Sequence, residues 1–278
     1  MSLSFEILCV TMHQKDFSKI KSMNIRSNVV FANQTDETSL KKIEFENHIA
    51  TIISTETRGV GKNRNIALLN ASADICLFAD DDVVYDDDLE KKVVGEFERH
   101  PDADVIIFNL ETDDKNRKQK IYPKTKKCSR FCRKPWATFK IAFRLDSVKK
   151  SNIWFSTLYG GGAIFPSGED SLWIMEAFHK GLIFYVSKEK IGKVSFAKST
   201  WFTGYDEKYF YGKGAYYKKA HPKSYFLWML YFSFRTRKMS KMGFGEKMNW
   251  MYKGLGGYNK LLSYEEYLRQ KNNGVGNE

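Results

Sequence analysis

Three consecutive aspartates, Asp80, Asp81 and Asp82, directly follow an apolar run at residues 75–79. Adjacent carboxylates repel one another unless a cation lies among them. The apolar run indicates a buried strand that ends where the acids begin, and ligands of open α/β sheets bind at the carboxyl ends of the strands. The pattern therefore predicts a divalent-metal site that holds a phosphorylated substrate.

A second acidic triplet, residues 86–88, stands just before an expected helix at residues 88–99. Carboxylates at this position cap free N–H groups and meet the positive end of the helix dipole. This structural role is a sufficient explanation for the second triplet, so we assign the metal chemistry to the first.

Upstream of the first triplet, residues 59–65 contain two glycines and lead into an expected helix at residues 62–72. Helix N-termini bind anions, and Arg64 supplies a charge for such a contact. The segment is neither a dinucleotide fingerprint nor a P-loop, because the glycine and Lys-Ser/Thr spacings of those motifs are absent. It is therefore a candidate anion-binding turn of another kind.

Two further acids, Glu169 and Asp170, lie at the start of an expected helix at residues 170–180. Asp170 is open to two interpretations from its position alone. It either caps the helix or serves as a catalytic carboxylate that takes a proton from a substrate.

Strand-like and helix-like segments alternate along the chain. Strands are expected at residues 5–11, 28–32, 49–54, 74–79, 104–110, 137–144 and 182–186. Helices between them are expected at residues 62–72, 88–99 and 170–180. This alternation indicates an α/β protein with a mostly parallel sheet and crossover helices.

The net charge is +12, and the basic residues concentrate at residues 115–134 and 213–241. Such patches attract polyanions, although the first block is explained equally well as a solvated loop.

From about residue 205 the chain has a helical, aromatic-rich pattern. Residues 225–234 are apolar, have basic flanks, and are too short to span a bilayer. We expect an interfacial helix at a membrane surface, and the alternative is a helix packed on the main domain.

The order of these motifs resembles that of family 2 glycosyltransferases of the GT-A fold. The segments that carry the resemblance are residues 59–65, 77–82, 160–163 and 168–170, and it covers about residues 4–200. It implies a GT-A domain at residues 1–204, with a nucleotide-sugar half at about 1–110 and an acceptor half at about 111–204. A helical C-terminal region follows at residues 205–278.

The resemblance also implies a nucleotide-diphosphate-sugar donor and a divalent cation. The implied donor-binding residues are Thr11, Asn33, Arg64, Asp80 and Asp81. The implied ligands of Mn²⁺ or Mg²⁺ are Asp80 and Asp82, which form the Asp-x-Asp motif. The cation would bridge the two phosphates of the donor and stabilise the charge of the leaving group.

On the acceptor side, the resemblance makes Asp170 the catalytic base, with Glu169 beside it shaping the acceptor site. The implied acceptor-binding residues are Gly161, Gly162 and Trp173. A carboxylate placed opposite the leaving group would take the proton of the acceptor hydroxyl, and such an arrangement inverts the anomeric configuration.

The chain departs from the family pattern at two places. Relatives often have an Asp after the second strand, where this chain has Asn33 and Gln34. Either one of these amides contacts the base of the donor or the contact is lost. Many relatives also have a His after the last strand as a further metal ligand, and residues 193–196 contain none.

We therefore expect an inverting glycosyltransferase that extends a lipid-linked saccharide acceptor in surface polysaccharide assembly. No secretory signal is expected, because the N-terminus lacks a basic region. The expected location is the cytoplasm, on the inner face of the cell membrane, with an anionic lipid surface and no nucleic acid as partner.

Two other function classes remain as alternatives. A metal-dependent nucleotidyltransferase would need a Gly-rich basic phosphate loop near the first strand, and residues 5–16 contain none. A basic nucleic-acid-binding protein without catalysis would explain the charge and the aromatic residues. It would leave the first acidic triplet unexplained, because carboxylates repel phosphate.

Overall fold

The structure, a computed structural model, describes residues 2–112, 114, 120–129, 136–195 and 204–274. Residues 115–119 and 130–134, half of the basic block predicted at residues 115–134, lie outside these residues. The contacts divide the chain into two compact units. The first comprises residues 1–156 and 170–198, and the second comprises residues 157–169 and 199–278.

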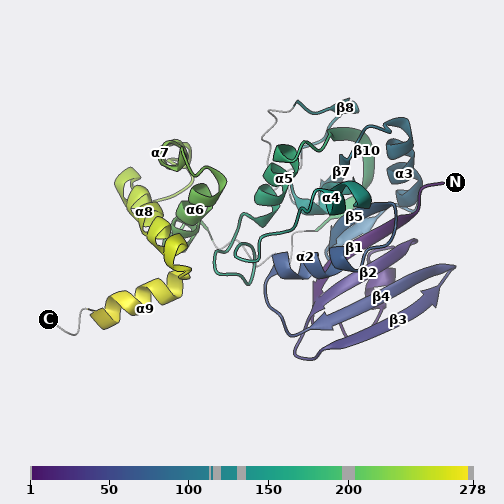
Figure 1. Cartoon of the computed structure of the whole chain (residues 1–278), viewed down its shortest axis with the longest axis horizontal. Coiled ribbons are helices and arrows are strands. Elements are labelled where there is room, and N and C mark those ends of the chain that lie inside the picture. The colour runs from purple at the N-terminus through teal and green to yellow at the C-terminus, as the bar shows by residue number, and fades with distance from the viewer. Residues whose placement is uncertain (1, 113, 115–119, 130–135, 196–203, 275–278) are drawn as a thin grey trace. The chain divides into compact units, whose positions relative to one another are not determined.

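The first unit is built on a β-sheet (Figure 1). Its strands are β1 (Phe5–Met12), β2 (Asn28–Gln34), β3 (Ser39–Phe45), β4 (His48–Thr55), β5 (Ile75–Asp80), β6 (Val83–Tyr85), β7 (Val105–Thr112), β8 (Lys126–Lys127), β9 (Ile141–Arg144) and β10 (Phe184–Val194). They follow the order β3-β4-β2-β1-β5-β9-β7-β10-β6, and β8 pairs with β10. β1 is therefore a central strand, which agrees with its apolar sequence and nearly complete burial.

The direction of the strands corrects one expectation. β4, β2, β1 and β5 run parallel, as predicted for the N-terminal part. β9 lies antiparallel between β5 and β7, so the sheet as a whole is mixed rather than mostly parallel. Apolar periodicity indicates that a segment is a strand but carries no information about its direction. The first residues of the strand predicted at 137–144 form a 3₁₀ turn instead, Thr138–Lys140.

Helices cover both faces of this sheet. They are α1 (Ser18–Ser22), α2 (Val60–Leu69), α3 (Leu89–Arg99), α4 (Leu145–Lys150) and α5 (Glu169–His179). Successive residues of β5 point to opposite faces, so Leu77 packs with Phe97 of α3, whereas Phe78 packs with Leu68 of α2 and Trp173 of α5. The fold is thus an α/β layered structure, as the alternating pattern predicted.

The second acidic triplet does not cap α3 with its side chains. Asp88 is the N-cap residue, yet its side chain makes no capping hydrogen bond. The Nζ of Lys92 lies 2.9 Å from Asp86 and 2.8 Å from Asp88 instead. The second triplet therefore has a structural role, as predicted, but the predicted mechanism, side-chain capping of the helix, was wrong. Lys92, one turn into α3, offers Asp86 and Asp88 a full positive charge instead.

The second unit is helical. It contains α6 (Glu207–Ala220), α7 (Tyr225–Arg235), α8 (Phe244–Lys260) and α9 (Tyr264–Gly274), and α6 packs on each of the other three (Figure 1). The Tyr159 hydroxyl donates to the Ala215 carbonyl at 2.9 Å, which ties the segment 157–169 to α6. This unit therefore includes a piece of the chain that the sequence had placed in the acceptor half. Among the described residues, no helix has the length and apolar character required to cross a bilayer.

α6 and α8 approach each other closely at glycines. A Cβ atom on Gly254 of α8 would lie 2.0 Å from the Tyr211 carbonyl oxygen of α6. A Cβ atom on Gly214 of α6 would lie 1.9 Å from the Met251 carbonyl oxygen. Gly256, in the same helix as Gly254, has nothing within 4 Å of that position. The crossing of the two helices thus depends on the absence of side chains at two positions.

Gly254→Ala should destabilise the second unit by about 1–3 kcal/mol, because the added methyl group meets backbone that cannot move independently. Gly256→Ala is the matched control and should stabilise α8 by up to about 1 kcal/mol through helix propensity alone. Thermal unfolding followed by helical circular dichroism measures both. Equal stability of the two variants would contradict the close crossing.

Candidate active site

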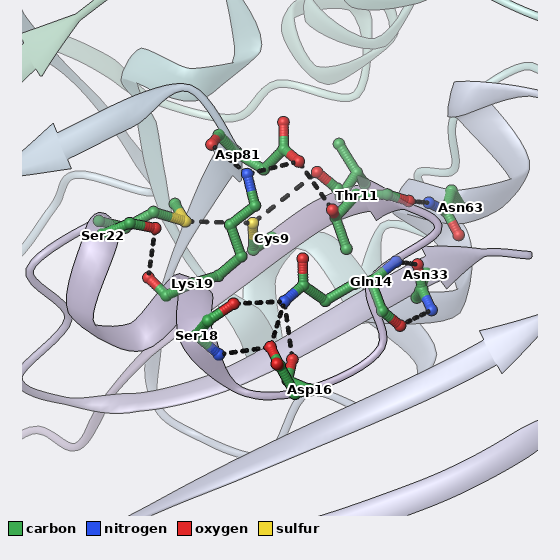
Figure 2. A network of polar contacts seen from close by, with 12 residues as sticks. Cys9, Thr11, Gln14, Asp16, Ser18, Lys19, Ser22, Asn33, Asn63 and Asp81 are labelled. Carbon is green, nitrogen blue, oxygen red and sulfur yellow. Dashed lines mark hydrogen bonds and ion pairs between the residues drawn. The ribbon is translucent and has the colours of Figure 1, made fainter.

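The first acidic triplet lies at the carboxyl edge of the parallel strands. β5 ends at Asp80, which pairs in register with Val10 of β1, so Thr11 of β1 is at the same edge. The Thr11 hydroxyl donates to Asp81 Oδ2 at 2.7 Å (Figure 2). The structure thus brings together Thr11 and Asp81, two residues predicted from the sequence to bind the donor.

Arg64, on α2, joins two of the predicted site residues. Its Nη2 lies 3.0 Å from Asp80 Oδ1, and its Nη1 lies 2.6 Å from Asp170 Oδ1. Arg64 is 4% exposed, and a buried guanidinium requires such anionic partners. Residues of α2, β5 and α5 therefore form one cluster. The predicted contact of Arg64 with the base or a phosphate of the donor stays a prediction.

The glycine-containing turn before Arg64 positions α2. A Cβ atom on Gly61 would lie 2.3 Å from the Ser156 carbonyl oxygen, so no larger residue fits there. Asn63 Nδ2 donates to the carbonyl oxygens of Thr11, at 3.2 Å, and Ala32, at 2.7 Å. These bonds attach the start of α2 to the ends of β1 and β2. The segment 59–65 thus directs Arg64 toward the acidic edge.

Asp170 lies in the first turn of α5, and both of its carboxylate oxygens are held. Oδ1 accepts from Arg64, and Oδ2 accepts from the Thr138 backbone N–H at 3.3 Å. These partners lie outside α5, so the interpretation of Asp170 as a helix cap is not supported. Its orientation is instead determined by α2 and by the turn that precedes β9.

A residue that the sequence analysis missed, Lys19 of α1, completes the cluster. Its Nζ lies 3.0 Å from Asp81 Oδ2 and donates to the Asp81 carbonyl oxygen at 3.0 Å (Figure 2). The two residues are 62 positions apart in the chain. Lys15 and Lys21 lie close to Lys19 in the sequence, and no local pattern marks Lys19 as the one that contacts Asp81.

Asp82 differs from its two neighbours because its Oδ1 is buried and has no hydrogen-bond partner among the described residues. Burial raises the pKa of Asp82 to about 6, and the charges of Asp80 and Asp81 add to the effect. A buried carboxylate oxygen without a partner is costly for the protein. It is therefore suited to receive a cation.

The charges of the cluster favour one divalent ion. The carboxylates of Asp80, Asp81, Asp82 and Asp170 face two cations, Arg64 and Lys19. In the described part of the chain, no group of three His, Cys, Asp or Glu side chains is arranged to hold a metal by itself. Mg²⁺ is commonly bound by one or two carboxylates together with substrate phosphates. Asp82, with Asp80 beside it, fits a metal of that kind.

Asn33 has a structural role rather than the predicted contact with the donor base. It is fully buried, and its Nδ2 donates to the Gln14 carbonyl and to Ser54 Oγ, both at 2.9 Å. Its Oδ1 accepts from the Gln14 backbone N–H at 2.9 Å (Figure 2). Gln34 likewise accepts from the Gly59 backbone N–H at 2.9 Å. The amides that might have replaced the family's Asp therefore support the loop and the turn around the site.

Trp173 was also wrongly placed by the sequence analysis. Its side chain is 1% exposed and lies against the rings of Phe78 and Phe155, inside the core of the first unit. A buried indole in this environment contributes to packing and cannot contact an acceptor. The helical spacing of Trp173 from Asp170 does not distinguish the buried side of α5 from its exposed side.

The remaining acceptor-side residues belong to the second unit. Gly161 and Gly162 are exposed in a turn closed by a hydrogen bond from the Ala163 N–H to the Gly160 carbonyl at 3.0 Å. Glu169 precedes Asp170, and its Oε2 accepts from the Gly168 N–H at 3.1 Å. Their predicted roles at the acceptor stay predictions.

The layered α/β unit and its acidic strand edge together define a GT-A fold, the class to which the sequence pattern pointed. A scan against protein-family models matches residues 21–160 to the family described as "Glycosyl transferase family 2". This match covers half of the chain, so the chain belongs to glycosyl transferase family 2. A search of curated proteins found no match.

Solved structures of TarS from S. aureus have a similar fold. The structure of TarS 1–349 with UDP-GlcNAc matches with a TM-score of 0.61 and 16% identity, over 92% of this chain and 80% of that one. The structure of TarS 1–349 with UDP matches with a TM-score of 0.60 and 17% identity, over the same shares. At this level of identity, the similarity establishes the fold.

Proposed function

We propose that this glycosyltransferase is metal-dependent and inverting, and that it moves a sugar from a nucleotide-diphosphate donor to a hydroxyl group of a saccharide acceptor. The observation that carries the proposal is the cluster at the end of β5. It combines an Asp82 oxygen that has no partner in the described part of the chain with a separate carboxylate, Asp170, that is held in place by Arg64. Asp82 would serve the leaving diphosphate through a bound cation, and Asp170 would serve the incoming hydroxyl group.

The donor would be held at the carboxyl edge of β1 and β5. Asp81 is fixed there by Thr11 and Lys19, and Arg64 brings a buried positive charge close to Asp80. Asp82, with Asp80, would hold Mn²⁺ or Mg²⁺, which supplies a positive charge to the departing diphosphate. Because the TarS structures contain UDP-GlcNAc and UDP, UDP-sugars are the first donors to test.

The transfer itself requires one bond to form and one to break. The acceptor oxygen attacks the anomeric carbon, and the bond from that carbon to the diphosphate breaks with its electron pair on the leaving oxygen. The proton of the acceptor hydroxyl passes to Asp170, the general base. Arg64 and the Thr138 backbone N–H would hold this carboxylate in a fixed orientation before the acceptor binds.

The acceptor proposed for this chain is a lipid-linked saccharide in the assembly of a surface polysaccharide. An anionic pyrophosphate lipid would suit the basic, aromatic C-terminal part of the chain. Membership of a glycosyltransferase family favours this function over the nucleotidyltransferase and the nucleic-acid-binding protein that the sequence left as alternatives.

A thermal-shift screen of the wild-type chain against UDP-, GDP- and dTDP-sugars, with Mn²⁺ and with EDTA, tests the proposal. At a ligand concentration of about 100 Kd, binding should stabilise the folded state by about 2.7 kcal/mol. We expect a rise in Tm with one class of sugar nucleotide, and loss of that rise in EDTA. No rise with any sugar nucleotide, or a rise that EDTA leaves unchanged, would contradict metal-dependent donor binding.

A further inference from the structure

α7 exposes an apolar face. Its residues Phe226, Leu227, Tyr231 and Phe234 are 51–66% exposed. Their spacing, with the half-buried Leu230 between them, places all five on one arc of the helix. The opposite arc is buried at Met229 and Ser233, and there Phe232 packs against Tyr217 of α6 with ring centroids 5.7 Å apart. We call the exposed arc the α7 face.

The sequence on both sides of α7 is basic. Between Glu207 and Glu246 the chain contains no acidic residue, and its basic residues there are Lys208, Lys213, Lys218, Lys219, Lys223, Arg235, Arg237, Lys238 and Lys241. At the two ends of α7, cations lie over aromatic rings. Lys218 is 4.3 Å from the centroid of Tyr225, and Arg237 is 4.3 Å from the centroid of Phe234. Basic side chains thus lie at both ends of the α7 face, and we call them its basic rim.

We propose that the α7 face docks on an anionic lipid bilayer, with the helix lying in the plane of the interface. Its apolar arc would enter the boundary between headgroups and acyl chains, and its basic rim would remain among the anionic headgroups. A large exposed apolar patch with a polar rim marks an interaction site for a protein, a membrane or a ligand, and the basic charge here favours a membrane with anionic lipids. The proposal concerns the second unit and does not depend on the donor chemistry of the first.

Two other possible partners, a second copy of the chain and a nucleic acid, fit the chemistry of the α7 face less well than a bilayer does. In a symmetric dimer, a second copy of this chain would bring its own basic rim against the first, and like charges repel. A nucleic acid would satisfy the basic residues, and its bases could stack on Phe226, but it offers little to the aliphatic side chain of Leu227. A bilayer with anionic lipids satisfies both the apolar arc and the charged rim.

Sedimentation of the full chain with vesicles tests this proposal. We expect binding to phosphatidylcholine vesicles that contain roughly a third of phosphatidylglycerol, weaker binding to pure phosphatidylcholine, and weakening by high salt. The double variant Leu227→Ser/Phe234→Ser should bind at least about tenfold more weakly, because two apolar side chains no longer enter the membrane. Leu40→Ser on β3, where Leu40 is 71% exposed in the first unit, is the matched control and should bind like the wild type.

The outcomes separate this proposal from its competitors and from the proposed function. Equal binding of the wild type and the double variant, or no vesicle binding at all, would overturn it. The proposal would also be overturned if the wild type formed a dimer in lipid-free solution, or was retained on DNA, and the double variant lost that behaviour. Asp82→Asn should bind vesicles like the wild type, so a failure of donor chemistry would leave this result unchanged. The Tm of the double variant, compared with that of the wild type, verifies that α7 remains folded.

Discussion

Asp82→Asn should abolish metal-dependent donor binding while the fold survives. Asn has nearly the same shape as Asp but no charge, so the cation would lose the carboxylate whose Oδ1 has no partner among the described residues. The loss of a metal contact worth several kcal/mol corresponds to a decrease of roughly 10²-fold or more in donor affinity with Mn²⁺. Titration calorimetry with the donor found in the screen measures this decrease.

The same substitution should stabilise the ligand-free chain at neutral and alkaline pH. The pKa of Asp82 in the folded chain is about 6, above its ordinary value of 3.8. Ionisation of Asp82 therefore costs folding stability as the pH rises through about 6, and Asn removes that cost. The gain in Tm over the wild type should shrink as the pH falls below that value.

Asp146→Asn is the control for both measurements. Asp146 is an exposed carboxylate that pairs with Lys150 on α4. Its replacement should change neither donor affinity nor the pH dependence of stability appreciably, since exposed ion pairs contribute little. An Asp82→Asn variant that keeps wild-type affinity for the donor with Mn²⁺ would show that the metal binds elsewhere or not at all.

Asp170→Asn should retain donor binding and lose about 10²-fold or more in turnover, the usual size of a general-base effect. The amide oxygen of Asn can still accept a hydrogen bond from Arg64 or from Thr138, so the side chain keeps much of its orientation. It cannot take the proton of the acceptor hydroxyl. Initial rates with saturating donor, together with donor affinity, separate the loss of chemistry from a loss of binding.

The neighbouring acid provides the comparison for this variant. Glu169→Gln should affect the KM for the acceptor more than kcat, because Glu169 is proposed to shape the acceptor site beside the base. Turnover of Asp170→Asn close to that of the wild type would place the base elsewhere. A large and equal loss of kcat in both variants would contradict the division of roles between them.

The central strands were predictable because their residues are buried and apolar. β1, β2, β4, β5 and β7 each contain a largely apolar run. β3 was missed because it is an exposed edge strand of mixed polar character, paired only with β4. Its hairpin turns at Glu46 and Asn47, both with positive φ, and a Glu in the first position gives little sign of such a turn.

The candidate site was predictable as far as the order of its motifs. Acids after β5 and at the start of α5 were expected to act together, and Arg64 does contact both Asp80, 16 residues away in the sequence, and Asp170, 106 residues away. The two wrong predictions concern residues whose side chains are buried. Asn33 and Trp173 face the interior, and a residue type at a given spacing does not reveal that. Lys19 was missed because its pairing with Asp81 is a tertiary contact without a local pattern.

A crystal structure of the chain soaked with UDP and Mn²⁺ tests the central claim most directly. We predict that the diphosphate lies at the carboxyl edge of β5, with the metal bound to Asp82 and bridging the two phosphates. A nucleotide bound far from residues 80–82, or bound there with its phosphates turned away from Asp82, would contradict the account.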